Sequence, residues 1–454
     1  MILRRKAVTS LSLILVALLT SCNQSSNEVY SRPMEEYASR DLRVAYITYG
    51  AAEVGYGFWT SQLTSTYRNL NIIAEAYESQ DEFLTTVTTQ LNAGEGPDLF
   101  LLDQGTPLSM QKMIQSGVFA DLTPYIEADS RLDVDNYAGF SAGEMDGKQY
   151  ILPFSVGSFA LYTTEENLDA YGITLSETPT IDEILTALEI AAAKGLEDSS
   201  LTPVLPLISR TDLSYFWLDA FNVPVVDLET GKVVLDKEFY RRLADLSRKL
   251  YPHFMDIFFE EKYNIYQSSE GLDSIIFVLN NRDRFIRNYN QCSTLFDAIG
   301  ETPVRITMPA YEDSLIQAGQ VSDYAAVNSD SDNILLAYET ARAIMDYPLD
   351  FRQINSGITF NGNAPASSSL YQTYLNQLVT HESNIMLDNK PIPIIYSNDL
   401  RDSILAEPVE YTLGEASVEN IVRSTMQEYV SGETDDFDGC WDNMVNRLEL
   451  YLDE

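Results

Sequence analysis

Strand-like and helix-like segments alternate over the start of the folded chain, and this alternation constrains the fold more than any other feature. Residues 42–49 and 71–77 are rich in β-branched, aromatic and apolar side chains, which is typical of strands. Residues 80–93 carry apolar side chains at helical spacing and stop at Gly94. A third strand is predicted at residues 99–102, and a further short strand at residues 324–328. Strands that alternate with helices predict βαβ units, a largely parallel sheet and therefore an α/β fold.

The N-terminus has the pattern of a secretion signal that ends at a cysteine. Three cations at positions 4–6 precede an apolar run over residues 11–20, which is too short for the ~20 residues that span a bilayer as a helix. Cys22 follows this run directly and resembles the lipobox cysteine of bacterial lipoproteins. The resemblance implies that residues 1–21 are removed and that Cys22 is acylated. The alternative is an ordinary signal peptide with a chance cysteine.

The segment after the cysteine and the overall charge describe a globular body held away from a membrane. Residues 22–40 are polar and aperiodic, as in a flexible tether. Removing residues 1–21 deletes three cations and no acidic residue, so the net charge of −39 becomes −42. Such an acidic chain repels nucleic acid and anionic lipid, which excludes a nucleic-acid partner. Its length of 454 residues is enough for two or three structural domains, and 45% hydrophobic residues is an ordinary composition for a globular chain.

The remaining cysteines leave two alternatives open. Cys292 and Cys440 can pair in an oxidising exterior, or both can be free thiols. The sequence contains no Cys-x-x-Cys motif and no Cys/His cluster, and the acidic cluster at 435–438 lacks the spacing of an EF-hand. We therefore expect no metal and no cofactor.

Several segments, in a fixed order, resemble those of one family. Asp146-Gly147 is a strong hairpin signal ahead of a long apolar run, and the C-terminal part is predicted as two helices that break at Gly432. The segments that match the family in order are residues 91–103, 117–129, 146–173, 180–195 and 446–454. Together they resemble bacterial extracellular solute-binding proteins of the carbohydrate-binding type (family 1), which serve ABC importers. Residues 276–300 depart from the pattern, because the family has a glycine-rich stretch there.

The resemblance implies a two-lobed periplasmic-binding-protein fold of type II, with α/β lobes and a ligand cleft between them. The N-terminal lobe is expected to comprise residues 41–152 and about 323–355. The C-terminal lobe is expected to comprise about 153–322 and 356–454. Lobes of this kind close around a ligand by bending at a hinge.

The same resemblance implies a function and a location. It predicts a monomeric, non-enzymatic receptor that captures a carbohydrate, with an oligosaccharide favoured, and delivers it to the membrane permease of an ABC importer. The lipid on Cys22 would hold the receptor at the extracellular face of the cell membrane, or on the periplasmic side in a Gram-negative cell. Anchoring raises the effective concentration of the receptor near its permease.

Candidate ligand-binding residues follow from the strand ends, because ligands of open α/β sheets lie beyond the carboxyl ends of the strands. Asp103 and Gln104 end the third strand and can bond sugar hydroxyls, although Asp103 can equally cap the next helix. Tyr56 and Trp59 follow the first strand and can pack on a sugar, although Trp59 can equally belong to the core of a helix.

Four further candidates come from later segments of the chain. Trp217 is the best aromatic candidate from the second lobe, with core packing as its alternative. Phe154 lies next to the predicted crossing between lobes, and Tyr311 follows a Met-Pro pair. Asn361 lies in a glycine-rich loop and can be either a ligand residue or a turn residue.

Two other functions stay open from the sequence. A surface glycoside hydrolase or esterase needs a nucleophile with a base or a pair of carboxylates. The only histidines are His253 and His381, and the chain has neither a Gly-x-Ser-x-Gly nor a His-Glu-x-x-His motif, but acidic residues are too abundant to exclude a catalytic pair. A solute-binding sensor or adhesin without transport is the third alternative.

Overall fold

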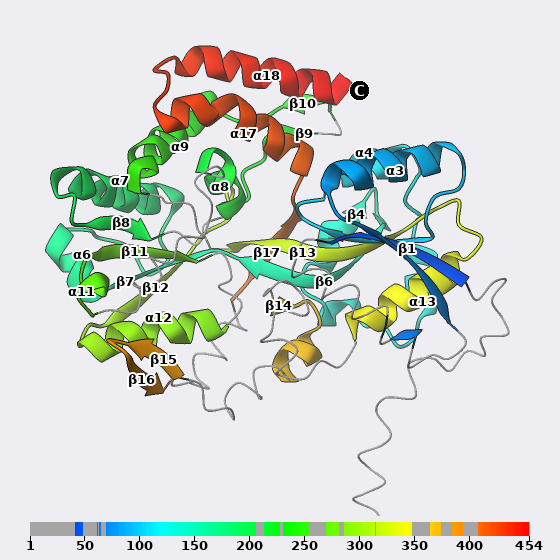
Figure 1. Cartoon of the computed structure of the whole chain (residues 1–454), viewed down its shortest axis with the longest axis horizontal. Helices are drawn as coiled ribbons and strands as arrows, with labels where there is room; N and C mark the ends of the chain where they lie inside the picture. The colour runs from blue at the N-terminus through cyan, green and yellow to red at the C-terminus, as the bar shows by residue number, and fades with distance from the viewer. Residues whose placement is uncertain are drawn as a thin grey trace, which may run out of the picture.

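The structure is a computed structural model, and the residues that it describes form two α/β lobes joined by strands that run between them (Figure 1). This arrangement confirms the predicted two-lobed α/β fold. The predicted positions Cys22, Tyr56, Trp59 and Asn361 lie outside the described residues. The structure describes residues 41–48, 61, 63–64, 70–106, 108–205, 213–227, 230–253, 269–280, 286–313, 315–346, 364–373, 384–393 and 407–453.

The first lobe is built on a seven-stranded mixed sheet in the order β14-β6-β13-β3-β1-β2, with β17 also paired to β13. The predicted βαβ order is confirmed, because β1 pairs in parallel with both β2 and β3. The prediction of a largely parallel sheet is wrong, because β13 is inserted between β3 and β6 and runs antiparallel to both. The strands are β1 (Asp41–Ile47), β2 (Asn71–Tyr77), β3 (Leu99–Asp103), β6 (Ile151–Ser158), β13 (Gln317–Val327), β14 (Ala364–Pro365) and β17 (Val409–Leu413).

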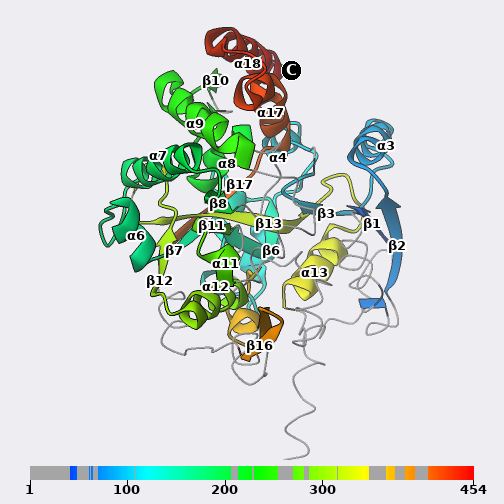
Figure 2. The same ribbon diagram turned by 60° about the vertical axis from the view of Figure 1, so that its left-hand side comes forward.

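Helices cover both faces of this sheet. Figure 2 shows β2 at the outer edge, with α3 and α13 on opposite sides of the strands. α3 begins as predicted, because the Ser79 hydroxyl accepts a hydrogen bond from the Glu82 amide at 3.2 Å. The helices of this lobe are α3 (Gln80–Asn92), α4 (Met110–Gln115), α5 (Thr123–Ala128) and α13 (Ile334–Met345), with short 3₁₀ turns η2 (Val134–Asn136) and η3 (Phe140–Gly143).

The predicted hairpin is confirmed between β4 (Glu144–Met145) and β5 (Lys148–Gln149). Asp146 and Gly147 both have positive φ angles, 53° and 71°. This is the backbone of a type I′ turn, which favours glycine at its second central position. The hairpin leads directly into β6, the first strand to leave the lobe.

The second lobe has a four-stranded sheet in the order β12-β7-β11-β8, covered by helices. Its strands are β7 (Ala160–Thr164), β8 (Thr202–Leu205), β11 (Ile275–Asn280) and β12 (Pro303–Thr307), with the small pairs β9 (Val226–Asp227) with β10 (Lys232–Val233) and β15 (Asn384–Leu387) with β16 (Lys390–Pro393). Its helices are α6 (Glu165–Tyr171), α7 (Ile181–Glu197), α8 (Leu213–Ala220), α9 (Lys237–Leu250), η5 (Tyr251–His253), α11 (Ser269–Leu272), α12 (Ile286–Ile299), α17 (Ala416–Ser431) and α18 (Phe437–Asp453).

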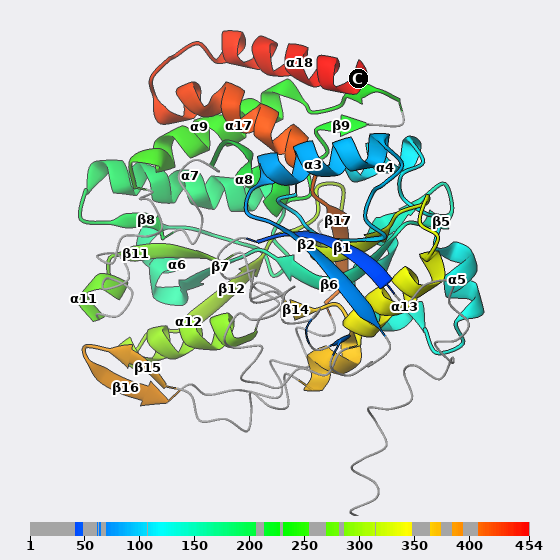
Figure 3. The ribbon, with the colours of Figure 1, turned by 45° about the vertical axis from the view of Figure 1, so that its right-hand side comes forward.

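The C-terminal helix pair packs onto the second lobe, above α8 and α9 (Figure 3). The predicted break is confirmed, because Gly432 ends α17 with a φ of 83° in the left-handed region. Phe437 and Trp441 of α18 join the same buried cluster as Trp217. None of the helices in the described part of the chain combines the length and the apolar character that a bilayer span requires.

Within the described ranges, three segments cross between the lobes. β6 ends at Ser158, and the chain continues two residues later as β7 in the second sheet. β13 returns in the opposite direction, and its Gln317 side chain donates a hydrogen bond to the Ser158 hydroxyl at 3.2 Å. β17 pairs in parallel with the same end of β13 and leads into α17.

The lobe boundaries remain a proposal, which the pairing of two short strands refines. β14 and β17 lie within residues 356–454, the stretch expected to belong to the C-terminal lobe, and both pair with strands of the first sheet. We therefore propose that β14 and β17 belong to the first lobe, whereas the β15–β16 pair and the helices α17 and α18 belong to the second.

Candidate functional site

Three polar side chains form a row at the carboxyl end of β3, where the crossing strands begin. In the strand register Asp323 lies opposite Asp103 on one side and opposite Ser155 on the other. Residues paired across neighbouring strands project from the same face of a sheet. All three are buried, and the Ser155 hydroxyl donates a hydrogen bond to the Asp323 carboxylate. We call Asp103, Asp323 and Ser155 the polar row.

Asp103 is used within its own turn. Its Oδ1 accepts hydrogen bonds from the Gly105 amide at 3.0 Å and from the Thr106 hydroxyl at 3.1 Å. Burial raises the pKa of Asp103, and the hydrogen bonds from Thr106 and Gly105 oppose that rise. These contacts form a turn and not a helix cap, so the capping alternative is wrong: α4 begins only at Met110, and Ser109 caps it. Ligand contact by this carboxylate stays a prediction.

Gln104 is the exposed neighbour of the polar row. Its backbone amide donates a hydrogen bond to the Ser322 carbonyl at 3.0 Å, which fixes the backbone beside β13, while the residue itself is exposed. An exposed amide held at a strand end can bond a sugar hydroxyl without any change in the fold. Of the predicted residues that the structure describes, Gln104 has the placement that best fits ligand contact.

The other described candidates lie deeper or farther along the chain. Trp217 is 1% exposed and its indole N–H donates to the Ser247 hydroxyl at 3.1 Å, which favours the core-packing alternative. Phe154 is also 1% exposed, within β6. Tyr311 is 36% exposed, and its ring packs on Phe239 with 5.2 Å between centroids. Contact of these three with a ligand stays a prediction.

Asp323 and Ser155 were missed by reasoning from the sequence. The predicted strand began at Tyr324, whereas β13 begins at Gln317 and is buried along its whole length. The available signal was a set of polar residues inside a buried apolar segment, since buried polar groups need partners. The partner of Asp323 lies 168 positions away, so only the fold brings it into place.

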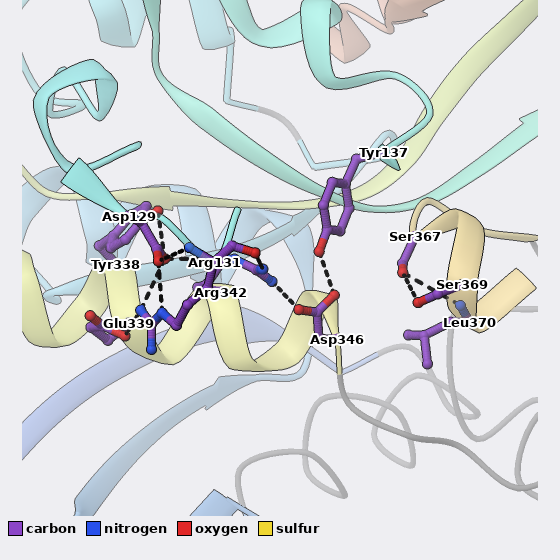
Figure 4. A network of polar contacts seen from close by, with 10 residues as sticks. All are labelled: Asp129, Arg131, Tyr137, Tyr338, Glu339, Arg342, Asp346, Ser367, Ser369 and Leu370. Carbon is purple, nitrogen blue, oxygen red and sulfur yellow. Dashed lines mark hydrogen bonds and ion pairs between the residues drawn. The ribbon is translucent and has the colours of Figure 1, made fainter. Parts of the chain in front are cut away.

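A second polar network lies inside the first lobe, between the end of α5 and α13 (Figure 4). Arg131 bonds the Asp129 carboxylate at 2.7 Å and the Glu339 carboxylate at 2.8 Å. The Tyr137 hydroxyl donates to Asp346 at 2.5 Å, and Arg342 pairs with the same carboxylate. The network holds α13 against the loop of residues 129–137 and is internally paired, so we assign it a structural role.

The charges in this network explain its pKa shifts. Burial of Asp129 favours the neutral acid, but the hydrogen bonds and charge of Arg131 outweigh burial, so the pKa of Asp129 is lowered. The hydrogen bond that the Arg131 guanidinium donates to Asp129 in turn raises the pKa of Arg131. Both groups therefore stay ionised at neutral pH.

Other polar features of the second lobe are also accounted for. Asp435 pairs with Arg248, and Asp438 pairs with Lys237 and Arg241, so these two carboxylates at the start of α18 have cationic partners. Cys440 carries a free thiol in α18. A surface cavity of about 340 Å³ lies between the end of α6 and α7, lined by residues such as Ile173, Thr186 and Ile190, and contains none of the predicted site residues.

Comparisons with known proteins relate part of the chain to one family. Residues 69–269 match the family model described as bacterial extracellular solute-binding protein. None of the curated proteins is significantly similar to the chain.

Solved structures share the fold over most of the chain. The sugar-binding protein MalE of Xanthomonas citri is 14% identical, with a TM-score of 0.60 over 91% of this chain and 97% of its own. An ABC substrate-binding protein of Listeria monocytogenes, solved with cycloalternan, is 15% identical, with a TM-score of 0.55 over 91% and 98%. A Thermotoga lettingae solute-binding protein with bound α-D-tagatose is 14% identical, with a TM-score of 0.55 over 91% and 100%.

These comparisons agree with the two lobes, the crossing strands and the order of segments seen in the sequence. At this identity the solved structures establish the fold, while the family model carries the relationship in sequence. The predicted resemblance is confirmed: residues 69–269 match the model of the bacterial extracellular solute-binding proteins, and the solved structures share the fold.

Proposed function

We propose that this protein is the substrate-binding subunit of an ABC importer and that it captures a carbohydrate between its two lobes. The observation that carries the proposal is the two-lobed fold joined by three crossing segments. Similar folds hold cycloalternan and α-D-tagatose in two of the solved structures. The match of residues 69–269 to a family of solute-binding proteins favours this function over that of a hydrolase.

In this proposal the carboxyl edge of the first sheet contributes to the ligand site. Gln104 would bond a sugar hydroxyl, and the polar row beside it would hold the strand ends at fixed positions. Tyr56, Trp59 and Asn361 would complete the site from segments that follow β1 and precede β14 in the sequence. Closure of the lobes would then remove the ligand from water.

A thermal-shift screen of the purified chain with mono- and oligosaccharides, amino acids and peptides tests the ligand class. A ligand at 100 times its Kd stabilises the protein by about 2.7 kcal/mol, so a saccharide should raise the melting temperature. A rise with amino acids or peptides alone would contradict the carbohydrate proposal. Gln104→Ala should reduce the saccharide shift, whereas Gln115→Ala, an exposed glutamine at the end of α4, should preserve it.

We further propose that acylated Cys22 anchors the protein to the cell membrane and keeps it beside the permease. Two or three acyl chains give durable anchoring, because each buried CH₂ contributes about 0.8 kcal/mol. Phase partition in a detergent that separates on warming measures the anchor. The expressed protein should enter the detergent phase, and Cys22→Ala should release it to water; equal partition of the two would contradict the anchor.

A further inference from the structure

The two lobes touch at a second place, where α4 of the first lobe meets the C-terminal helix pair of the second. Figure 3 shows the C-terminal end of α18 above α3 and α4. The Lys112 ammonium donates a hydrogen bond to the Tyr451 carbonyl and lies 3.8 Å from the centroid of the Tyr451 ring. One lysine of α4 therefore holds the last turns of α18.

Glu415 completes this contact from the start of α17. Its carboxylate accepts hydrogen bonds from the Ser109 hydroxyl at 3.3 Å and from the Tyr451 hydroxyl at 3.5 Å. Ser109 also begins α4, because its hydroxyl accepts a hydrogen bond from the Lys112 amide at 3.2 Å. The same serine thus fixes the first turn of α4 and binds the other lobe.

Glu415 lies directly beside a crossing segment. It follows Gly414, the residue after β17, and is the residue before α17 begins. Gly414 in turn lies against Gln104, the exposed residue at the end of β3. The contact therefore lies next to the strand end that carries the polar row.

The environment of Glu415 favours its neutral form. Burial raises its pKa from the usual 4.5 to about 7, against smaller opposing effects of Ser109, the Gln111 amide, Tyr451 and the charge of Lys112. Tyr324 of β13 and Tyr215 of α8 also face it, and its charge raises the pKa of both. Besides Glu415, the charges of Asp219, Glu419 and Arg423 also act on Tyr215.

We propose that Ser109, Lys112, Glu415 and Tyr451 form an interlobe latch that takes up a proton when it closes, so that acidity stabilises the lobe arrangement seen here. A latch that joins α4 to the C-terminal helix pair opposes rotation of the lobes about the crossing strands. The inference does not depend on the identity of the ligand.

The direction of the pH effect follows from proton linkage. The latched state binds the proton more tightly than a solvated Glu415 does, since its pKa is about 7 rather than 4.5. The latch is therefore strongest below the ordinary carboxyl value, weakens as the pH rises from there to about 7, and changes no further above it.

Distance measurements between the lobes by pulsed electron paramagnetic resonance test the latch. Nitroxides are attached at Thr88→Cys in α3 and Ala193→Cys in α7, both exposed positions, in the full chain with Cys22, Cys292 and Cys440 replaced by serine. The distance distribution should shift between pH 5 and pH 8. Glu415→Gln should show at pH 8 the distribution that the parent shows at pH 5, because the glutamine is neutral at both values.

Matched variants make the outcome decisive. Glu419→Gln, one turn farther along α17 and paired with Arg423 at 2.6 Å, should keep the pH response of the parent. Lys112→Ala should broaden the distribution at both pH values, and Ser109→Ala serves as a second route if the Glu415 variant does not fold. A parent distribution that is the same at pH 5 and pH 8, or a Glu415→Gln variant that still responds to pH, would overturn the proposal.

Discussion

Asp103 and Glu415 are two buried or partly buried carboxylates whose pKa values are both raised by burial, yet their partners come from different places. Asp103 bonds Gly105 and Thr106, two and three residues along the same chain segment. Glu415 bonds Ser109, which lies 306 positions away in the other lobe. Local contacts of the first kind persist when lobes rotate, whereas contacts of the second kind must break or form. Asp103 therefore stabilises a local turn, whereas the contact of Glu415 depends on how the two lobes are arranged.

Of the substitutions that test this comparison, Asp103→Ala is expected to change the folding free energy most. The substitution leaves the buried Thr106 hydroxyl and the Gly105 amide without their carboxylate partner, which costs about 1–3 kcal/mol of folding free energy. Asp103→Asn keeps an acceptor and should lose less. Urea unfolding measures both, and a Asp103→Ala variant as stable as the parent would show that the turn needs no acceptor.

An intermediate and pH-dependent effect is expected from Glu415→Gln. Because the native pKa of about 7 exceeds the usual 4.5, ionising this carboxyl costs stability as the pH rises between these values. The variant should therefore melt a few degrees above the parent at pH 8 and no higher than the parent at pH 5. Thermal unfolding at the two pH values measures this, and a variant less stable than the parent at both would assign Glu415 a role as a charged acceptor.

The smallest effect is expected from Asp435→Asn, which serves as a baseline for both carboxylates. Asp435 pairs with Arg248 at 2.5 Å, but its side chain is 94% exposed. Water and salt screen such a pair, so the melting temperature should not change measurably. The interlobe distance should be unchanged as well, and a shift in either quantity would mean that surface charge alone acts on the hinge.

Local signals in the sequence predicted much of the fold. The strand at 71–77 is β2 without any change of bounds, and the helix at 80–93 matches α3 to its last turn. The Asp146-Gly147 turn and the break at Gly432 are also as predicted. Each of these features depends on side-chain period or on a positive φ angle, and both can be recognised from neighbouring residues alone.

Long-range pairing produced what the sequence did not show. β13 extends seven residues farther toward the N-terminus than predicted, because it pairs with strands on both sides and with β17 at its start. The apolar run at 156–162 is divided between two sheets, since one chain segment serves both lobes. The Asp323–Ser155 and Glu415–Ser109 contacts likewise join distant segments. The predicted ligand residues also remain to be tested.

The pairing of β17 with β13 sets the order in which the fold can be completed as the chain is synthesised. The first sheet lacks this strand until residue 413 has been synthesised, and the second core lacks α17 and α18 until the last residues arrive. Neither lobe is a contiguous stretch that can mature on its own. Such non-local closure slows folding and leaves strand edges exposed to other chains until the C-terminal segments are in place.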